Sequence, residues 1–256
     1  MKDFSLPTGS GERRDFLTRI LCAPRAEENL RTLAEKGKFK ELLPEVHAMI
    51  GVTQPPEYHP EGDVFEHTMI MLRHMVFPDP LLGWSVLLHD VGKPLTRSVE
   101  ESGRIRFFGH EEKGALLADE ILRRFKFDAE KRDIICHAVR NHMRFAHVTA
   151  MRQAKLERLM KEPFFGLELE LHRLDCISCH GKMEGFDFLL GQYVRMAPPE
   201  PEKFLSGRDL LERGITPGVR MGRILRDIRK MQLSGKICSR EQALDYVNNL
   251  RKDEIK

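Results

Sequence analysis

Apolar residues recur with a helical period along almost the whole chain, and no convincing run of alternating β-branched residues appears. Asp63 and Glu66 form a capping pair in front of VFEHTMIMLRHM, which predicts a helix over about residues 64–77. Pro78 ends that helix, and Asp79 and Pro80 supply the N-cap and first position of the next, which runs through LLGWSVLLHD. The pattern predicts an all-α fold.

The same periodicity predicts the remaining helices of the first 200 residues. They are expected at about 111–126, 129–143, 150–161, 166–180 and 184–195, with two or three more before residue 50. The short stretch RIRFF near residue 106 is the one hint of extended structure, and it is compatible with a small hairpin formed with the preceding loop.

The proline-rich stretch MAPPEPEKF is the clearest linker. It predicts a domain over residues 1–196 and a small helical appendix over residues 203–256. Within the appendix, Thr216 with Pro217 opens one helix, and Ser239 with Gln242 opens the last one as a capping box.

Composition adds to this prediction only by excluding some classes of protein. The chain has 256 residues, enough for a large core, and 41% hydrophobic and 32% charged residues are typical of a soluble globular protein. Neither an N-terminal apolar signal region nor a run of about 18 apolar residues is present, so we expect a cytoplasmic protein that does not enter a membrane.

The stretch LDCISCHG contains a C-x-x-C-H pattern, formed by Cys176, Cys179 and His180. The pattern is compatible with c-type haem attachment, with half of a zinc site, or with cysteines buried in a helix. Five cysteines without an export signal favour reduced thiols, and the other three cysteines are isolated in the sequence. We therefore expect buried helix cysteines and no haem.

Positive charge gathers toward the C-terminus, where residues 201–256 hold 13 Lys and Arg against 8 Asp and Glu. Arg220, Arg223, Arg226 and Arg229 recur every three residues on one predicted helix. Such a ridge can contact a nucleic-acid backbone or can simply be the solvated face of an amphipathic helix. The absence of interleaved aromatic residues favours the second interpretation.

Histidines and carboxylates cluster at predicted helix ends, in the order His67, His89-Asp90, His110, His142 and Asp175. A His-Asp pair that ends the apolar run VLLHD is costly to bury without a compensating cation. Imidazole nitrogen and carboxylate oxygen together suit Mn, Fe, Co, Ni or Zn, and a mixed set with open positions is typical of hydrolytic metal centres. The alternatives are a polar helix terminus at His89-Asp90 and a buried polar pair of His67 with Asp175.

Four of these residues, His67, His89, Asp90 and Asp175, resemble the signature of HD-domain metal-dependent phosphohydrolases. The stretches YHPEGDVFEHT, LLHDVGKP, FFGHEEKGA, RNHMRF and SGRDLLERGITPG together resemble the HD and tail regions of bacterial CCA-adding enzymes, over roughly residues 43–250. The resemblance implies an HD helical bundle in which those four residues bind metal. His110 and His142 match the additional histidines of members that hold two ions, so one or two ions are expected.

The nucleotidyltransferase head of that family has no counterpart in the forty or so residues before Leu43. The resemblance therefore implies an HD module with phosphatase or phosphodiesterase activity on nucleotides or small phosphate esters, including 2',3'-cyclic nucleotides. Asp90 and Lys93 are the expected catalytic residues, and Lys93, Arg140 and Arg144 are candidates for binding the substrate phosphate. The alternative is a non-catalytic module that binds tRNA or another RNA.

Overall fold

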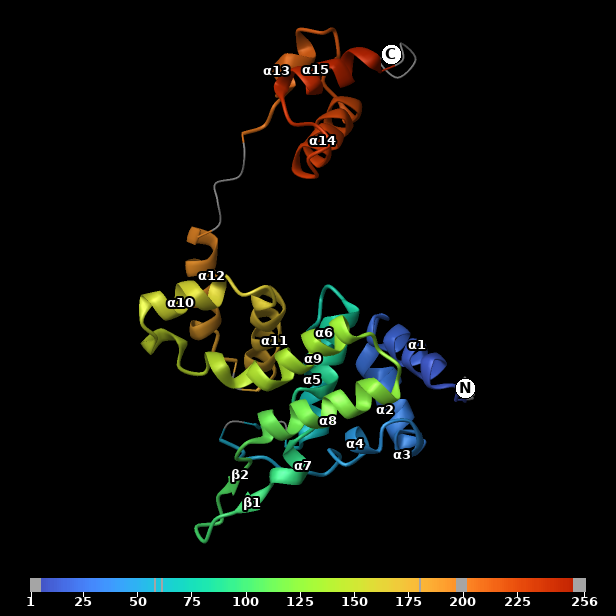
Figure 1. The fold of residues 1–256 in the computed structure, drawn as a ribbon, viewed down its shortest axis with the longest axis vertical. Coiled ribbons are helices and arrows are strands. Elements are labelled where there is room, and N and C mark those ends of the chain that lie inside the picture. The colour runs from blue at the N-terminus through green and yellow to red at the C-terminus, as the bar shows by residue number, and fades with distance from the viewer. Residues whose placement is uncertain (1–5, 58, 61, 180, 197–201, 251–256) are drawn as a thin grey trace. The chain divides into compact units, whose positions relative to one another are not determined.

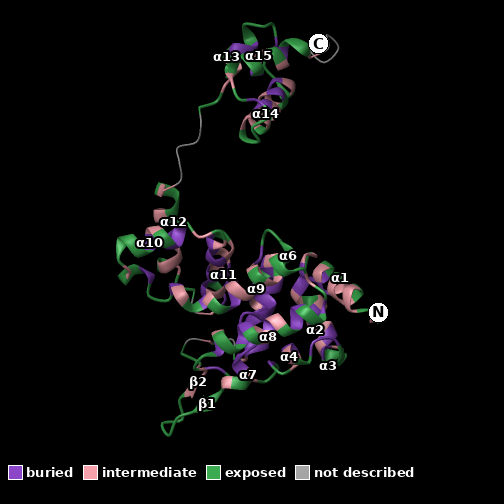
Figure 2. Ribbon diagram, viewed as in Figure 1, coloured by how far each residue is buried: buried purple, intermediate pink, exposed green. Residues whose placement is uncertain are grey.

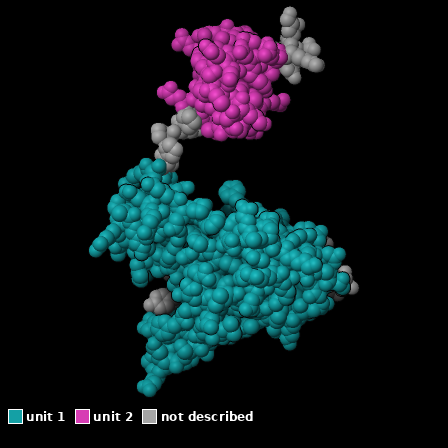
Figure 3. All heavy atoms as spheres, viewed as in Figure 1, with its two compact units in different colours: residues 1–196 teal, residues 197–256 magenta. Residues whose placement is uncertain are grey.

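A computed structural model of the chain describes residues 6–250 except 58, 61, 180 and 197–201. The chain divides into two compact units, residues 1–196 and residues 197–256 (Figure 3). The stretch interpreted as a linker falls largely on residues 197–201, which lie outside the described residues. The described residues are overwhelmingly helical (Figure 1), so the prediction of an all-α fold is confirmed.

The first unit contains most of the secondary structure. Its N-terminal part comprises α1 (Ser10–Leu21), α2 (Ala26–Glu35), α3 (Phe39–Leu42), α4 (Pro44–His47), α5 (Val64–His74), α6 (Pro80–Leu88) and α7 (Lys93–Thr96). A hairpin of β1 (Ser98–Val99) and β2 (Ile105–Arg106) follows. The rest comprises α8 (His110–Arg124), α9 (Ala129–Asn141), the 3₁₀ turns η1 (His142–Phe145) and η2 (Val148–Ala150), α10 (Gln153–Met160), α11 (Phe165–Ser178) and α12 (Glu184–Met196).

The helix starts predicted at Asp63, Asp79 and Ser239 are found in the structure. The helix predicted to open at Thr216 and Pro217 begins only at Val219, because the backbone of Gly218 before it is not helical. The Asp63 side chain accepts a hydrogen bond from the backbone N–H of Glu66 at the start of α5. The Asp79 side chain accepts from the N–H groups of Leu81 and Leu82 at the start of α6, where Pro80 is the first helical residue. Both caps satisfy N–H groups that have no partner inside the helix, so α5 and α6 begin at defined positions.

Helices α5, α6, α8, α9 and α11 pack against one another in the centre of this unit (Figure 1). Their facing side chains form the main hydrophobic core, and Trp84 of α6 is its largest fully buried side chain. The buried residues accordingly concentrate in these central helices (Figure 2). A second cluster, which includes Phe145, Phe165 and Leu189, lies among η1, α10, α11 and α12.

The second unit has its own small core. It consists of α13 (Gly207–Leu211), α14 (Val219–Leu233) and α15 (Arg240–Asn249), and the Ser239 side chain caps α15 by accepting from the N–H of Gln242. Leu210, Ile224, Ile228 and Val247 are among its buried residues. None of the described helices in either unit is long and apolar enough to cross a lipid bilayer.

Candidate metal centre

The structure brings the predicted metal ligands together from five segments that are distant in the sequence. His67 lies on α5, and His89 and Asp90 follow the last residue of α6. His110 is the first residue of α8, His142 the first residue of η1, and Asp175 lies on α11. His67, His89, Asp90, His110 and His142 are buried, and Asp175 is partly exposed. This packing of central helices makes one polar cluster inside an apolar core.

Two glycines allow the turn after Asp90 to approach the start of α8. A Cβ atom at Gly92 would lie 2.2 Å from the backbone oxygen of His110 and 2.6 Å from the backbone nitrogen of Gly114. Gly109, immediately before α8, has a φ of +71°, a conformation that glycine adopts without steric cost. These positions bring His110 close enough to Asp90 to share a site with it.

Three histidine rings are oriented by the same kind of hydrogen bond. The Nδ1 atoms of His89, His110 and His142 lie 2.8, 2.8 and 2.7 Å from the backbone oxygens of Val86, Phe107 and Val139. A carbonyl oxygen only accepts, so each Nδ1 carries the proton and each Nε2 points toward the cluster. Histidines that ligate metals are commonly held in this way.

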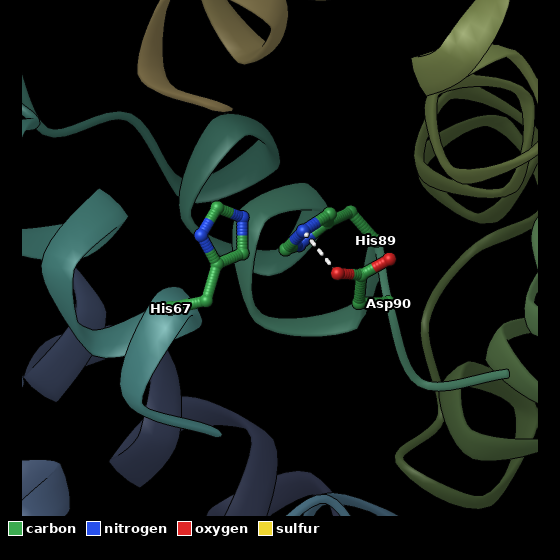
Figure 4. Close-up of side chains that lie close together, drawn as sticks. All are labelled: His67, His89 and Asp90. Carbon is green, nitrogen blue, oxygen red and sulfur yellow. Dashed lines mark ion pairs between the residues drawn. The ribbon is translucent and has the colours of Figure 1, made fainter. Parts of the chain in front are cut away.

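Asp90 lies where two groups of possible ligands meet. His67, His89 and Asp90 (Figure 4) form one group, and Asp90, His110 and His142 form the other; within each, the ligand atoms lie within 4.8 Å of one another. Asp90 Oδ2 lies 3.1 Å from His89 Nε2, and Asp90 Oδ1 lies 3.4 Å from His110 Nε2 and 3.6 Å from His142 Nε2. The carboxylate is thus placed to contact one ion in each group.

Asp175 is not a member of either group, but it lies beside the first one and contacts His67. Its Oδ1 atom lies 3.0 Å from Nε2 of His67. Burial alone would raise the pKa of Asp175, but the hydrogen bond and charge of His67 outweigh burial and hold the pKa well below its usual range. The carboxylate is therefore ionised at neutral pH, as a metal ligand must be.

The electrostatics of the remaining ligands also suit a cation. Burial by itself would raise the pKa of Asp90, but the adjacent His89 imidazole and the ammonium group of Lys93 outweigh this effect and hold the pKa well below its ordinary value. Burial lowers the pKa of His142 to about 3, so its imidazole is neutral at physiological pH. An ionised carboxylate beside a neutral imidazole is the state in which both can bind a metal.

Lys93 lies on the floor of the same site. Its Nζ atom is 2.7 Å from Asp90 Oδ2 and donates a hydrogen bond of 2.6 Å to Oε1 of Gln54. Nothing in the local sequence of the buried Gln54 signals its approach to a lysine 39 residues away, so its role becomes visible only in the structure. The two contacts hold the ammonium group beside the candidate ligands.

A cleft of about 560 Å³ opens onto the cluster. His89, Asp90, Lys93, His110, His142 and Asp175 line it, together with the segment from Arg104 to Phe108. Of the two arginines expected to bind phosphate, Arg140 pairs with Glu112, and Arg144 pairs with Glu162 and Glu168. Neither is among the described residues that line the cleft; the arginines found there are Arg104 and Arg106.

Arg144 belongs to a partly buried network centred on the buried Glu168. It forms an ion pair with Glu168 of α11, and Oε1 of the same carboxylate lies 2.8 Å from Nδ1 of His137 on α9. Glu168 is only 1% exposed, and burial raises its pKa to about 7 against the opposing charge of Arg144. Since Arg144 follows His142 by two residues and Glu168 lies on the helix of Asp175, this network links the segments that carry two candidate ligands.

The cysteines of the C-x-x-C-H pattern lie at the end of α11. Cys176 is buried, with its Sγ atom 3.6 and 3.7 Å from the two ring nitrogens of His172. Burial raises the pKa of this thiol to about 12, so it is protonated at neutral pH. His180, the third residue of the pattern, lies outside the described residues.

Comparison with known proteins finds one matching family and several similar proteins. Residues 63–169 match the HD domain family. The chain is 30% identical to the A-adding tRNA nucleotidyltransferase of Deinococcus radiodurans (96% of this chain, 60% of that protein) and 32% identical to the CC-adding tRNA nucleotidyltransferase of Thermus thermophilus (91% and 55%). It is 33% identical to the multifunctional CCA protein of Halorhodospira halophila (83% and 52%). The chain thus spans between about half and three fifths of the length of these relatives.

Proposed function

Because this chain carries an HD domain and is homologous to CCA-adding enzymes over most of its length, we propose that it is a metal-dependent phosphohydrolase or phosphodiesterase. Its substrate would be a nucleotide, including 2',3'-cyclic nucleotides, or another small phosphate ester. His67, His89, Asp90 and Asp175 would hold one divalent ion of Mn, Fe, Co, Ni or Zn. Asp90, His110 and His142 would hold a second.

One observation carries the proposal. The Nε2 atoms of His110 and His142 face each other at 3.1 Å, although both rings carry their proton on Nδ1. Two buried lone pairs that point at each other are unfavourable unless a positive charge lies beside them. Asp90 Oδ1 and His89 Nε2, also buried, have no hydrogen-bond partner among the described residues. A divalent cation satisfies all of these atoms, and the donor set fits it.

The proposed chemistry divides between the ion and the chain. A divalent ion held by these residues would supply acidification of a water molecule and positive charge beside the phosphate oxygens. The backbone oxygens of Val86, Phe107 and Val139 keep the three imidazoles in the orientation that presents Nε2. Lys93, held by Gln54, adds a fixed positive charge where the cleft meets the ligands. Catalysis by such a site depends mainly on fixed charges aimed at the transferring phosphate.

Hydrolysis of phosphate esters, followed as release of p-nitrophenol or by chromatography of the nucleotide products, tests this function directly. We expect hydrolysis of bis-p-nitrophenyl phosphate and of at least one member of a panel of 2',3'-cyclic nucleotides and dNTPs in the presence of Mn, Co or Ni. Asp90→Ala should lower the rate by more than about a hundredfold, because mutations of groups that only orient a ligand already cost about ten- to a hundredfold. Glu130→Ala, an exposed carboxylate on α9, is the matched control and should not change the rate. Equal rates for Asp90→Ala and the wild type would refute the assignment.

A second candidate function is a non-catalytic RNA-binding module. It is supported by α14, where the exposed residues Arg223, Arg226 and Lys230 alternate with buried Met221, Ile224 and Ile228, and by relatives named as tRNA nucleotidyltransferases. A protein that binds no metal and hydrolyses none of the substrates, but binds tRNA with an affinity that falls steeply with salt, would favour this function over the first.

A further inference from the structure

The segment from Arg104 to Phe108 forms one wall of the cleft and is tied directly to the candidate metal centre. Arg106 pairs with Ser98 and Ile105 with Val99 in the antiparallel hairpin. The backbone oxygen of Phe107 accepts the hydrogen bond from Nδ1 of His110. These contacts fix the position of this wall relative to the candidate ligand His110.

Two large apolar side chains are left exposed on the lining of this cleft. Phe108 is 74% exposed and Met143, on η1, is 46% exposed, and both line the cleft. An exposed aromatic ring beside a candidate phosphate-processing site has a clear physical use, because every nucleobase can stack on it.

The positively charged side chains that line the cleft differ in whether they already have an ion-pair partner. Lys93 is held by Asp90 and Gln54, and Arg106 pairs with Glu100 at 2.9 Å while its guanidinium lies 5.7 Å from the ring centroid of Phe108. Arg104 is exposed, lines the cleft and has no ion pair among the described residues. Arg104 immediately precedes β2, and its backbone oxygen accepts a hydrogen bond of 2.9 Å from the N–H of Glu100, which fixes the backbone of this residue at the edge of the cleft.

We propose that Phe108 and Arg104 form a subsite for the part of the ligand beyond the reacting phosphate, in which Phe108 stacks on a nucleobase and Arg104 binds a second phosphate. The inference rests on the proposed function and deepens it. The two residues select nucleotides with a base and a further phosphate over simple phosphate esters. The guanidinium of Arg104 suits this role because it presents paired donors to phosphate oxygens.

Three probes separate the two contributions. Ribose 5-phosphate has one phosphate and no base, AMP adds the base, and ADP adds the second phosphate. Calorimetric titration of the full chain in Mn²⁺ should show AMP binding about tenfold more tightly than ribose 5-phosphate, the size expected for one base stacked on an aromatic ring. Phe108→Ala should abolish this preference, and Phe108→Tyr should keep it. Phe77→Ala, which removes another exposed phenylalanine, should have no effect.

The second phosphate is tested in the same way. Arg104→Gln should reduce the preference for ADP over AMP by about fivefold, more at low salt than at high salt. Arg123→Gln is the matched control, because Arg123 is an exposed arginine on α8 that pairs with Asp119. Unchanged preferences in Phe108→Ala and Arg104→Gln, or a wild type that binds the three probes equally, would overturn the proposal.

Hydrolysis of bis-p-nitrophenyl phosphate, measured in parallel, distinguishes this inference from the function on which it rests. If the ester is hydrolysed but the preferences do not depend on Phe108 and Arg104, the subsite is refuted and the hydrolase stands. If the preferences behave as predicted but none of the phosphate compounds is hydrolysed, the subsite stands as a nucleotide-binding site and the hydrolase is refuted.

Discussion

Replacing Glu168 should reveal how strongly the segment that carries His142 depends on a buried carboxylate. Glu168→Leu removes the partner of Arg144 and of His137 from a position that is 1% exposed. Glu168→Gln keeps the shape, and its amide can accept from Arg144 and donate to Nδ1 of His137. The pair of variants separates the loss of the contacts from the loss of the charge.

The expected loss of stability depends on the contacts that Arg144 keeps after Glu168 is replaced. Removing one partner of a buried ion pair costs about 3–5 kcal/mol, and Arg144 keeps Glu162 at 2.7 Å, so we expect about 3 kcal/mol for Glu168→Leu. Glu168→Gln should cost no more than about 1 kcal/mol. For a unit of this size, about 3 kcal/mol corresponds to a decrease in Tm of roughly 6–12 °C.

Thermal and urea unfolding at pH 7, followed by circular dichroism, would measure both variants. Glu45→Leu is the control, because Glu45 forms a two-hydrogen-bond ion pair with the more exposed Arg124, far from the metal centre, and should cost about 1 kcal/mol. The reasoning is refuted if Glu168→Leu is no more destabilising than Glu45→Leu, or if Glu168→Gln is as destabilising as Glu168→Leu.

The same residues should make stability depend on pH. Burial raises the pKa of Glu168 from 4.5 to about 7, and Arg144, Glu162 and His137 face its carboxyl group. Between pH 4.5 and pH 7 the folded protein therefore keeps a proton on Glu168 that the unfolded chain has lost. The wild type should therefore lose up to about 3 kcal/mol of stability as the pH rises from 5 to 8, and Glu168→Gln should not, as urea unfolding at several pH values would show. Burial raises the thiol pKa of Cys136 to about 11 and that of Cys176 to about 12. Both thiols should therefore be alkylated far more slowly at pH 8 than the exposed Cys238, as peptide mass spectrometry would show. Equal alkylation rates would contradict the burial of these two thiols. Adding Mn²⁺ at a hundredfold excess over its Kd should stabilise the fold by about 2.7 kcal/mol, an increase in Tm that EDTA reverses; a Tm insensitive to both would argue against a bound ion.

Local sequence signals predicted much of the fold because helix starts depend on neighbouring residues. Asp63 and Asp79 cap α5 and α6 at the expected positions, and the hairpin near RIRFF is present. The ends were less accurate: the helix expected to reach residue 143 ends at Asn141, where η1 changes the direction of the chain so that His142 faces the cluster.

The candidate ligands could be selected from the sequence through their resemblance to the HD-domain signature, and the structure brings them close together. The residues that form the walls of the cleft could not be predicted from the sequence. Arg140 and Arg144 flank a candidate ligand in the sequence but pair with glutamates, whereas Arg104 reaches the cleft through a hairpin whose placement depends on tertiary packing. Proximity in sequence was a poor guide to which cations face the site.

The central claim is that Asp90 is shared by two metal-binding groups. Plasma mass spectrometry of protein that has been stripped, reloaded with Mn²⁺ or Co²⁺ and desalted would count the ions directly. We predict two ions per chain for the wild type, one for His142→Ala, which disrupts only the group with His110, and fewer than one for Asp90→Ala. A wild type that retains one ion or none, or an Asp90→Ala variant that retains as much as the wild type, would contradict the account.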